Sequence, residues 1–177
     1  MNDVATASAY GELIEPTTLR IQRILPGPIE RVWDYLTKSD LRRKWLASGD
    51  MLPMAGSEFE LTWRNDELSD PPGKRPEGFG AQHSMKSRII TFDPPRRLAH
   101  TFGEHGEVTY ELEPAGQRVL LTLVHRRLPD RATMVKVSAG WHAHLDILAA
   151  CASGEKPQPF WDSWLRLKDE YEKRLSA

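Results

Sequence analysis

The histidines are the residues whose chemistry is easiest to assess from this sequence. His142 and His144 lie two positions apart, and on a helix two such side chains point about 200° apart, so they cannot chelate one ion. The other histidines come from four separate segments, at His83, His100, His105 and His125. The sequence contains no phosphate-binding loop motif and no GxSxG, HExxH or CxxC motif. We therefore expect no metal and no cofactor, and we assign no catalytic residue.

His144 could still contribute to binding. It lies at the flank of an apolar helical stripe, next to Trp141 and Leu148 in helical projection. One interpretation is a polar anchor for a ligand or a weak acid or base, and the other is a core histidine bonded to a backbone carbonyl. We favour the core histidine. For His125, at the end of an apolar strand, a structural role is favoured more strongly.

The stretch that must position these groups is Arg131–Ser153, where apolar residues recur at helical spacing. One stripe of this predicted helix contains Met134, Val137, Trp141, Leu145, Leu148 and Ala152. A second strip of small or apolar residues contains Ala139, Ala143, Ile147 and Ala150. Asp130 is a good N-cap, and Gly154 ends the helix. Two apolar sides predict a sheet on one face and either the chain's own tail or a second subunit on the other.

Alternating patterns predict the sheet. Strands are expected at Thr18–Leu25, Glu58–Trp63, His83–Phe92, Arg97–Phe102, Glu107–Glu113 and Arg118–Arg127, with a short one near Met51–Met54. Two short helices, at 29–37 and 41–45, follow the first strand. The fold class is therefore α+β, with an antiparallel sheet of six to seven strands curved around the long helix. We divide the chain into a flexible segment 1–16, a domain 17–155 and a helical extension 156–177.

Two segments outside this pattern are informative. Residues 64–82 are rich in Pro and Gly, and this is a long connection for a compact domain, so it is a lid, a decoration or disordered. The tail, Pro159–Leu175, is an amphipathic helix with Trp161, Trp164, Leu165, Tyr171 and Leu175 on one side. Its tryptophans need burial, either on the long helix or against a partner, so a homodimer is one arrangement that the tail would allow.

The composition limits the function classes. The 177 residues carry a net charge of −1, with no basic excess to attract nucleic acid or anionic lipid. Cys151 is the single cysteine, which excludes an intramolecular disulfide. No apolar run of about 18 residues is present to enter a membrane, and residues 1–16 lack the pattern of a secretory signal. We expect a cytoplasmic protein.

Large rings on the inward faces of the strands and the long helix predict a cavity, because bulky rings on a strongly curved sheet cannot all close on the helix. Tyr110, His144 and Arg88 would supply its polar groups. The residues that we expect to bind a ligand are Trp45, Met51, Phe59, Leu61, Trp63, Arg88, Phe102, Tyr110, Trp141, His144, Leu145 and Leu148.

Four stretches resemble one known family, in the family's order. They are TLRIQRILPGPIERVWDYLTKSDLRRKWL from Thr18, FDPPRRLAHTF at 92–102, VTYELEPAGQRVLLTLVHRRL at 108–128 and GWHAHLDILAACASGE at 140–155. They resemble the START-like superfamily (SRPBCC, or Bet v-like), in the branch of the homologues of the heat-shock-protein-ninety ATPase activator. The resemblance implies a helix-grip fold: seven antiparallel strands curled around the C-terminal helix, with a hydrophobic cavity between them.

Three functional hypotheses follow. Superfamily members bind lipids, sterols or polyketides, so the preferred one is binding of a small hydrophobic or aromatic molecule without chemistry. The second is an enzyme of the cyclase or aromatase kind, which a few superfamily members are, using Tyr110, His144 or Arg88 as acid, base or oxyanion groups. The third is a co-chaperone-like interaction module with a chaperone partner, which predicts a filled interior and an exposed apolar patch.

Overall fold

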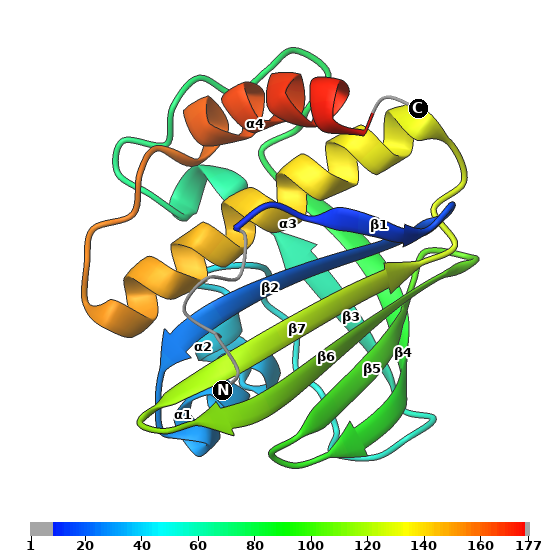
Figure 1. The fold of residues 1–177 in the computed structure, drawn as a ribbon, viewed down its shortest axis with the longest axis vertical. Coiled ribbons are helices and arrows are strands. Elements are labelled where there is room, and N and C mark those ends of the chain that lie inside the picture. The colour runs from blue at the N-terminus through cyan, green and yellow to red at the C-terminus, as the bar shows by residue number, and fades with distance from the viewer. Residues whose placement is uncertain (1–8, 176–177) are drawn as a thin grey trace.

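A seven-stranded antiparallel sheet wraps around the long helix α3 (Arg131–Ser153) in the computed structural model, which describes residues 9–175 (Figure 1). The sheet order is β1-β2-β7-β6-β5-β4-β3. The strands are β1 (Glu12–Glu15), β2 (Thr18–Pro26), β3 (Glu58–Trp63), β4 (His83–Asp93), β5 (Arg97–Phe102), β6 (Gly106–Ala115) and β7 (Arg118–Arg126). The other helices are α1 (Ile29–Thr37), α2 (Ser39–Arg42), the 3-10 turn η2 (Asn65–Glu67) and α4 (Phe160–Arg174). The predicted α+β helix-grip fold is confirmed.

Alternation fixes which face of each strand meets α3. In β2, Leu19, Ile21 and Leu25 are buried, and Ile21 lies opposite Leu123 of β7. Arg23 shares this inward face and is only 8% exposed. Its guanidinium lies 3.0 Å from the Asp146 carboxylate of α3, so the one charged group on this face of β2 is paired.

Helix α3 begins and ends where its sequence predicts. The Asp130 carboxylate accepts a hydrogen bond of 2.7 Å from the N–H of Thr133, and this bond lowers the pKa of Asp130. Gly154 adopts the left-handed conformation, with φ of 72°, that terminates many helices. Helix α4 then packs along α3, on the side of α3 away from the sheet (Figure 1). The tail therefore packs on the side of α3 that carries the second apolar strip. This is one of the two predicted arrangements, the other being coverage by a second subunit.

The structure differs from the sequence-based expectations in three places. The seventh strand is β1, inside the segment expected to be flexible, while residues 51–54 form no strand. On α4, Leu167 is fully buried and Leu165 is 40% exposed, so the predicted apolar side was rotated by part of a turn. The first eight residues of the N-terminal segment lie outside the described part of the chain.

Candidate functional site

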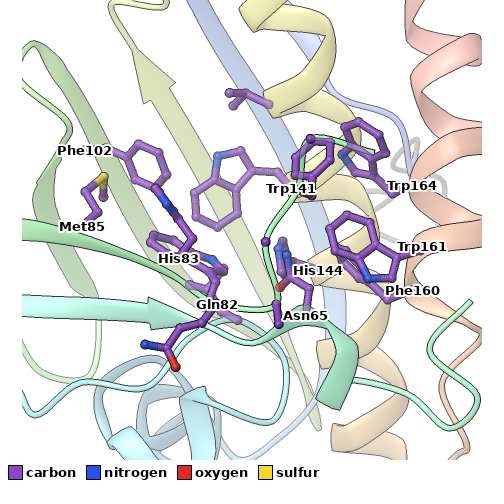
Figure 2. A pocket seen from close by; sticks show the side chains of 18 residues that line it. Asn65, Gln82, His83, Met85, Phe102, Trp141, His144, Phe160, Trp161 and Trp164 are labelled. Carbon is purple, nitrogen blue, oxygen red and sulfur yellow. The ribbon is translucent and has the colours of Figure 1, made fainter. Parts of the chain in front are cut away.

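A cavity of about 420 Å³ lies where the β3–β4–β5 side of the sheet meets α3, α4 and the loop between η2 and β4. Figure 2 shows the side chains that surround it. They are Leu46, Trp63, Asn65, Gly78, Phe79, Gly80, Ala81, Gln82, His83, Met85, Phe102, Val137, Gly140, Trp141, His144, Phe160, Trp161 and Trp164. Most of the lining is apolar or aromatic, and its volume suits a small organic molecule.

The sheet and α3 form one wall of this cavity. Trp63 ends β3, Phe102 ends β5, and their ring centroids are 5.9 Å apart in an edge-to-face arrangement. The Phe102 ring is also 5.9 Å from the Trp141 ring of α3. These spacings are those of favourable aromatic pairs, so the three rings hold one another in position.

Helix α4 and the 64–82 loop form the opposite wall. The Phe79 ring lies 5.4 Å from Trp161 and 5.2 Å from Trp164. Figure 2 shows Phe160, Trp161 and Trp164 extending from α4 toward the space that Trp141 faces from the other side. The cavity is therefore completed by two segments that lie outside the sheet and α3.

Hydrogen bonds hold this loop to the start of α4. The Trp161 N–H donates to the Pro72 carbonyl at 3.0 Å, and the Trp161 indole N–H donates to the Asp66 carboxylate at 2.7 Å. The Phe160 N–H donates to the Ser69 hydroxyl at 2.9 Å. A Cβ on Gly73, which has φ of 81°, would lie 2.8 Å from the backbone nitrogen of Asp162, so glycine permits this close approach. The long connection is thus an ordered part of the cavity wall.

His144 is the polar group that α3 contributes to the cavity. Its Nδ1 lies 2.8 Å from the carbonyl oxygen of Trp45, as the favoured interpretation of a core histidine required. Burial lowers the pKa of His144 to about 4, against a smaller opposing effect of that carbonyl. The ring is therefore neutral at pH 7. His125, favoured as structural, accepts a hydrogen bond of 2.9 Å at Nδ1 from the Trp141 indole N–H.

Four of the residues predicted to bind a ligand lie on the cavity wall: Trp63, Phe102, Trp141 and His144. Five others are packed in the core instead: Trp45, Phe59, Leu61, Leu145 and Leu148. Met51 borders a separate shallow depression beside α2. The interior between the sheet and α3 is thus largely closed by interlocking side chains, and the space that remains is displaced toward α4.

The three groups suggested for catalysis do not converge. Tyr110 does not reach the cavity, because its hydroxyl is 3.0 Å from Nε2 of His100 inside the core, where burial raises its pKa. Arg88 points to the outer face of β4, where its side chain is 60% exposed and 3.5 Å from the Glu58 carboxylate. Ser87 and Ile89, its neighbours in β4, face inward, so alternation places Arg88 outside. His144 alone of the three lines the cavity.

The wall from α4 and the loop was not assigned to the site from the sequence. Phe79, Phe160, Trp161 and Trp164 all belong to it. The sequence offered two signals, the Trp-rich tail that needs burial and the unusually long connection at residues 64–82. What the sequence did not show is that these segments pack on each other.

Within residues 9–175, no group of three or more His, Cys, Asp or Glu side chains is placed to hold a metal ion. In the same range, no helix is long and apolar enough to cross a membrane.

A family model described as Activator of Hsp90 ATPase homolog 1-like protein matches residues 26–153 of this chain. A solution NMR structure of a Bordetella parapertussis protein is 37% identical, with a TM-score of 0.79, and the match covers 100% of this chain and 97% of that one. No curated protein matches.

Two more distant structures share the fold. CalU16 from Micromonospora echinospora is 21% identical, with a TM-score of 0.65, and the match covers 90% of this chain and 89% of that one. A conserved protein from Enterococcus faecalis is 17% identical, with a TM-score of 0.68, and the match covers 98% and 92%.

Proposed function

The chain belongs to the family of Activator of Hsp90 ATPase homolog 1-like proteins, and we propose that it binds a small hydrophobic or aromatic molecule, of lipid, sterol or polyketide-like character, in the cavity described above. Binding requires no chemistry. The observation that carries the proposal is the open space of about 420 Å³ between Trp141 and the rings of α4. Aromatic rings that pack against each other elsewhere in the core leave this volume unfilled.

The energetics are adequate for such binding. Burial of apolar surface contributes about 25 cal/mol per Å², and association costs consume a large part of that gain. A bicyclic aromatic molecule in this cavity should therefore bind with a dissociation constant of roughly 1–100 μM. The hypothesis of an interaction module predicted a filled interior and an exposed apolar patch, whereas the space that remains beside α4 supports ligand binding.

Gly140 offers a direct way to close the cavity. It lies on the wall, and a Cβ built on it would meet only the Trp164 indole nitrogen, at 3.9 Å, which is an ordinary contact. In Gly140→Leu the larger side chain should occupy the space and weaken binding of an aromatic ligand at least about tenfold. The measurement is calorimetric titration of the full chain with naphthalene derivatives.

Gly140→Ala is the matched control. Alanine fills almost none of the cavity, so affinity should stay within about twofold of wild type. The free energy of unfolding should rise by about 0.5–1 kcal/mol, because glycine is unfavourable inside a helix. If no member of a set of lipids, sterols and aromatic compounds gives saturable binding, or if the Leu variant binds as well as wild type, the proposed function is wrong.

A further inference from the structure

The cavity has no charged wall. Its described lining contains no Asp, Glu, Lys or Arg side chain, and His83 and His144 are its only titratable side chains. His83 is exposed to solvent, whereas His144 is 7% exposed. A carboxylate or phosphate enclosed here would find no cation, and enclosing an unpaired charge costs several kcal/mol. The cavity therefore disfavours anionic ligands.

The tautomer of His144 follows from its hydrogen bond. The carbonyl oxygen of Trp45 can only accept, so the proton of the neutral ring lies on Nδ1. Nε2 then carries a lone pair, and it has no hydrogen-bond partner among residues 9–175. Because burial lowers the pKa of His144 to about 4, Nε2 remains an acceptor throughout the neutral pH range.

Other polar groups of the lining agree with this assignment. The indole N–H groups of Trp141 and Trp161 are used inside the protein, on His125 and Asp66. The Asn65 side-chain oxygen has no partner within the described chain, but it is fully enclosed, so a ligand in the cavity does not reach it. The lining thus offers a ligand hydroxyl one accessible acceptor, Nε2 of His144.

Donors are also present, because the indole N–H groups of Trp63 and Trp164 make no hydrogen bond within the described residues. Neutral N–H groups can serve an ether or carbonyl oxygen, but they do not offset the charge of a carboxylate. The ligand class is therefore narrowed by two separate features: the missing cation and the free acceptor.

We propose that the ligand is an uncharged aromatic molecule with a hydroxyl group, and that this hydroxyl donates a hydrogen bond to Nε2 of His144. The proposal rests on the proposed function and specifies its ligand. Apolar contact with Trp141, Phe102 and Trp164 would supply most of the affinity. The hydroxyl would select among ligands of the same size, and a carboxylate placed inside the cavity would bind more weakly than its neutral analogue.

The test compares three compounds of one shape: 2-naphthol, 2-methoxynaphthalene and 2-naphthoate. Titrations of the full chain near pH 7.5 leave the naphthol uncharged. We expect 2-naphthol to bind about three- to tenfold more tightly than the methoxy compound, the range given by one net hydrogen bond. We expect 2-naphthoate to bind at least about tenfold more weakly than the methoxy compound, because its charge is unpaired.

His144→Asn isolates the acceptor. The asparagine amide can still donate to the Trp45 carbonyl from a position near that of Nδ1, but nothing replaces Nε2. In this variant 2-naphthol and 2-methoxynaphthalene should bind equally. The matched control is His105→Asn, which changes an exposed histidine outside the cavity and should leave the preference intact. If His144→Asn does not fold, the comparison of the three compounds on wild type decides.

The outcomes separate the two proposals. If the compounds bind to wild type with equal affinity, or 2-naphthoate binds most tightly, the inference about the hydroxyl and charge is overturned while cavity binding stands. The inference about the hydroxyl is also overturned if His144→Asn still binds 2-naphthol more tightly than 2-methoxynaphthalene. If none of the three binds saturably, and no other apolar compound does, the proposed function itself fails.

Discussion

Lowering the pH from 7 to 5 should reduce the free energy of unfolding by roughly 5–7 kcal/mol. The cause is a set of buried histidines. Burial lowers the pKa of His100, His125 and His144 to about 4 and that of His142 to about 3. In the unfolded chain each imidazole takes up a proton near pH 6.5, whereas in the folded chain each stays neutral until about pH 4 or below.

The direction of this effect follows from proton binding. Because the unfolded state binds more protons between pH 6.5 and 4, stability is full above pH 6.5 and is lost as the pH falls through this range. His142 belongs to the set although Asp146 lies 3.4 Å from its Nε2. Burial is the largest cause there, and the nearby Arg23, Arg166 and Arg174 add to it, while Asp146 is already paired with Arg23.

Urea unfolding at pH 7, 6 and 5 measures this loss, provided that the urea dependence of the free energy stays constant. His125→Asn is the control, because its amide oxygen can still accept from the Trp141 indole. In that variant unfolding should take up about one proton fewer, so the slope of the free energy of unfolding against pH should fall by about 1.4 kcal/mol per pH unit near pH 5. A free energy of unfolding that is flat between pH 7 and 5 would contradict the assignment of neutral buried rings.

Tyr171→Phe should reduce the free energy of unfolding by about 2–3 kcal/mol. The hydroxyl of this fully buried residue accepts a hydrogen bond of 2.7 Å from the Gly11 N–H and lies 2.9 Å from Nδ1 of His142. Because the Gly11 N–H already donates to this oxygen, the hydroxyl proton is available to donate to Nδ1 of the neutral His142 ring. Removing the hydroxyl oxygen leaves the Gly11 N–H and Nδ1 of His142 unpaired. The two lost hydrogen bonds join α4 to the segment before β1 and to α3.

Tyr35→Phe provides the comparison for this variant. Tyr35 is also buried, at 7% exposure, but its hydroxyl makes no hydrogen bond to another described residue. Its replacement should change the free energy of unfolding by less than about 1 kcal/mol. Urea unfolding of both variants at pH 7.5 tests the difference. Equal losses would show that the Tyr171 hydroxyl does not hold the three segments together.

The fold could be predicted because most of its signals are local. The spacing in Arg131–Ser153 and the alternation in strands such as Arg118–Arg126 set the inward faces, and the order of these elements indicated the helix-grip arrangement. Strand β1 carried no such signal, because its four residues, ELIE, form a short and mostly exposed edge. It is recognisable only from its pairing, in which Leu13 lies opposite Leu19.

The site could be predicted only in part. Alternation along the strands identified Trp63 and Phe102 as facing α3, and helical spacing identified Trp141 as facing the sheet. The structure places all three at the cavity. Alternation gives the face on which a residue lies, but not which inward side chains pack against each other. Phe59 and Leu61 were therefore expected at the cavity, although they pack in the core. The α4 wall depends on contacts between residues far apart in the sequence, such as Ser69 and Phe160, which are 91 positions apart, and no local pattern encodes them.

The structure of the full chain with 2-naphthol at saturating concentration tests ligand binding most directly. We predict that the naphthalene rings occupy the space between Trp141, Phe102 and Trp164, with the hydroxyl oxygen within hydrogen-bond distance of Nε2 of His144. The contrary result would be a saturated protein in which this space is empty and the naphthol lies elsewhere on the molecule.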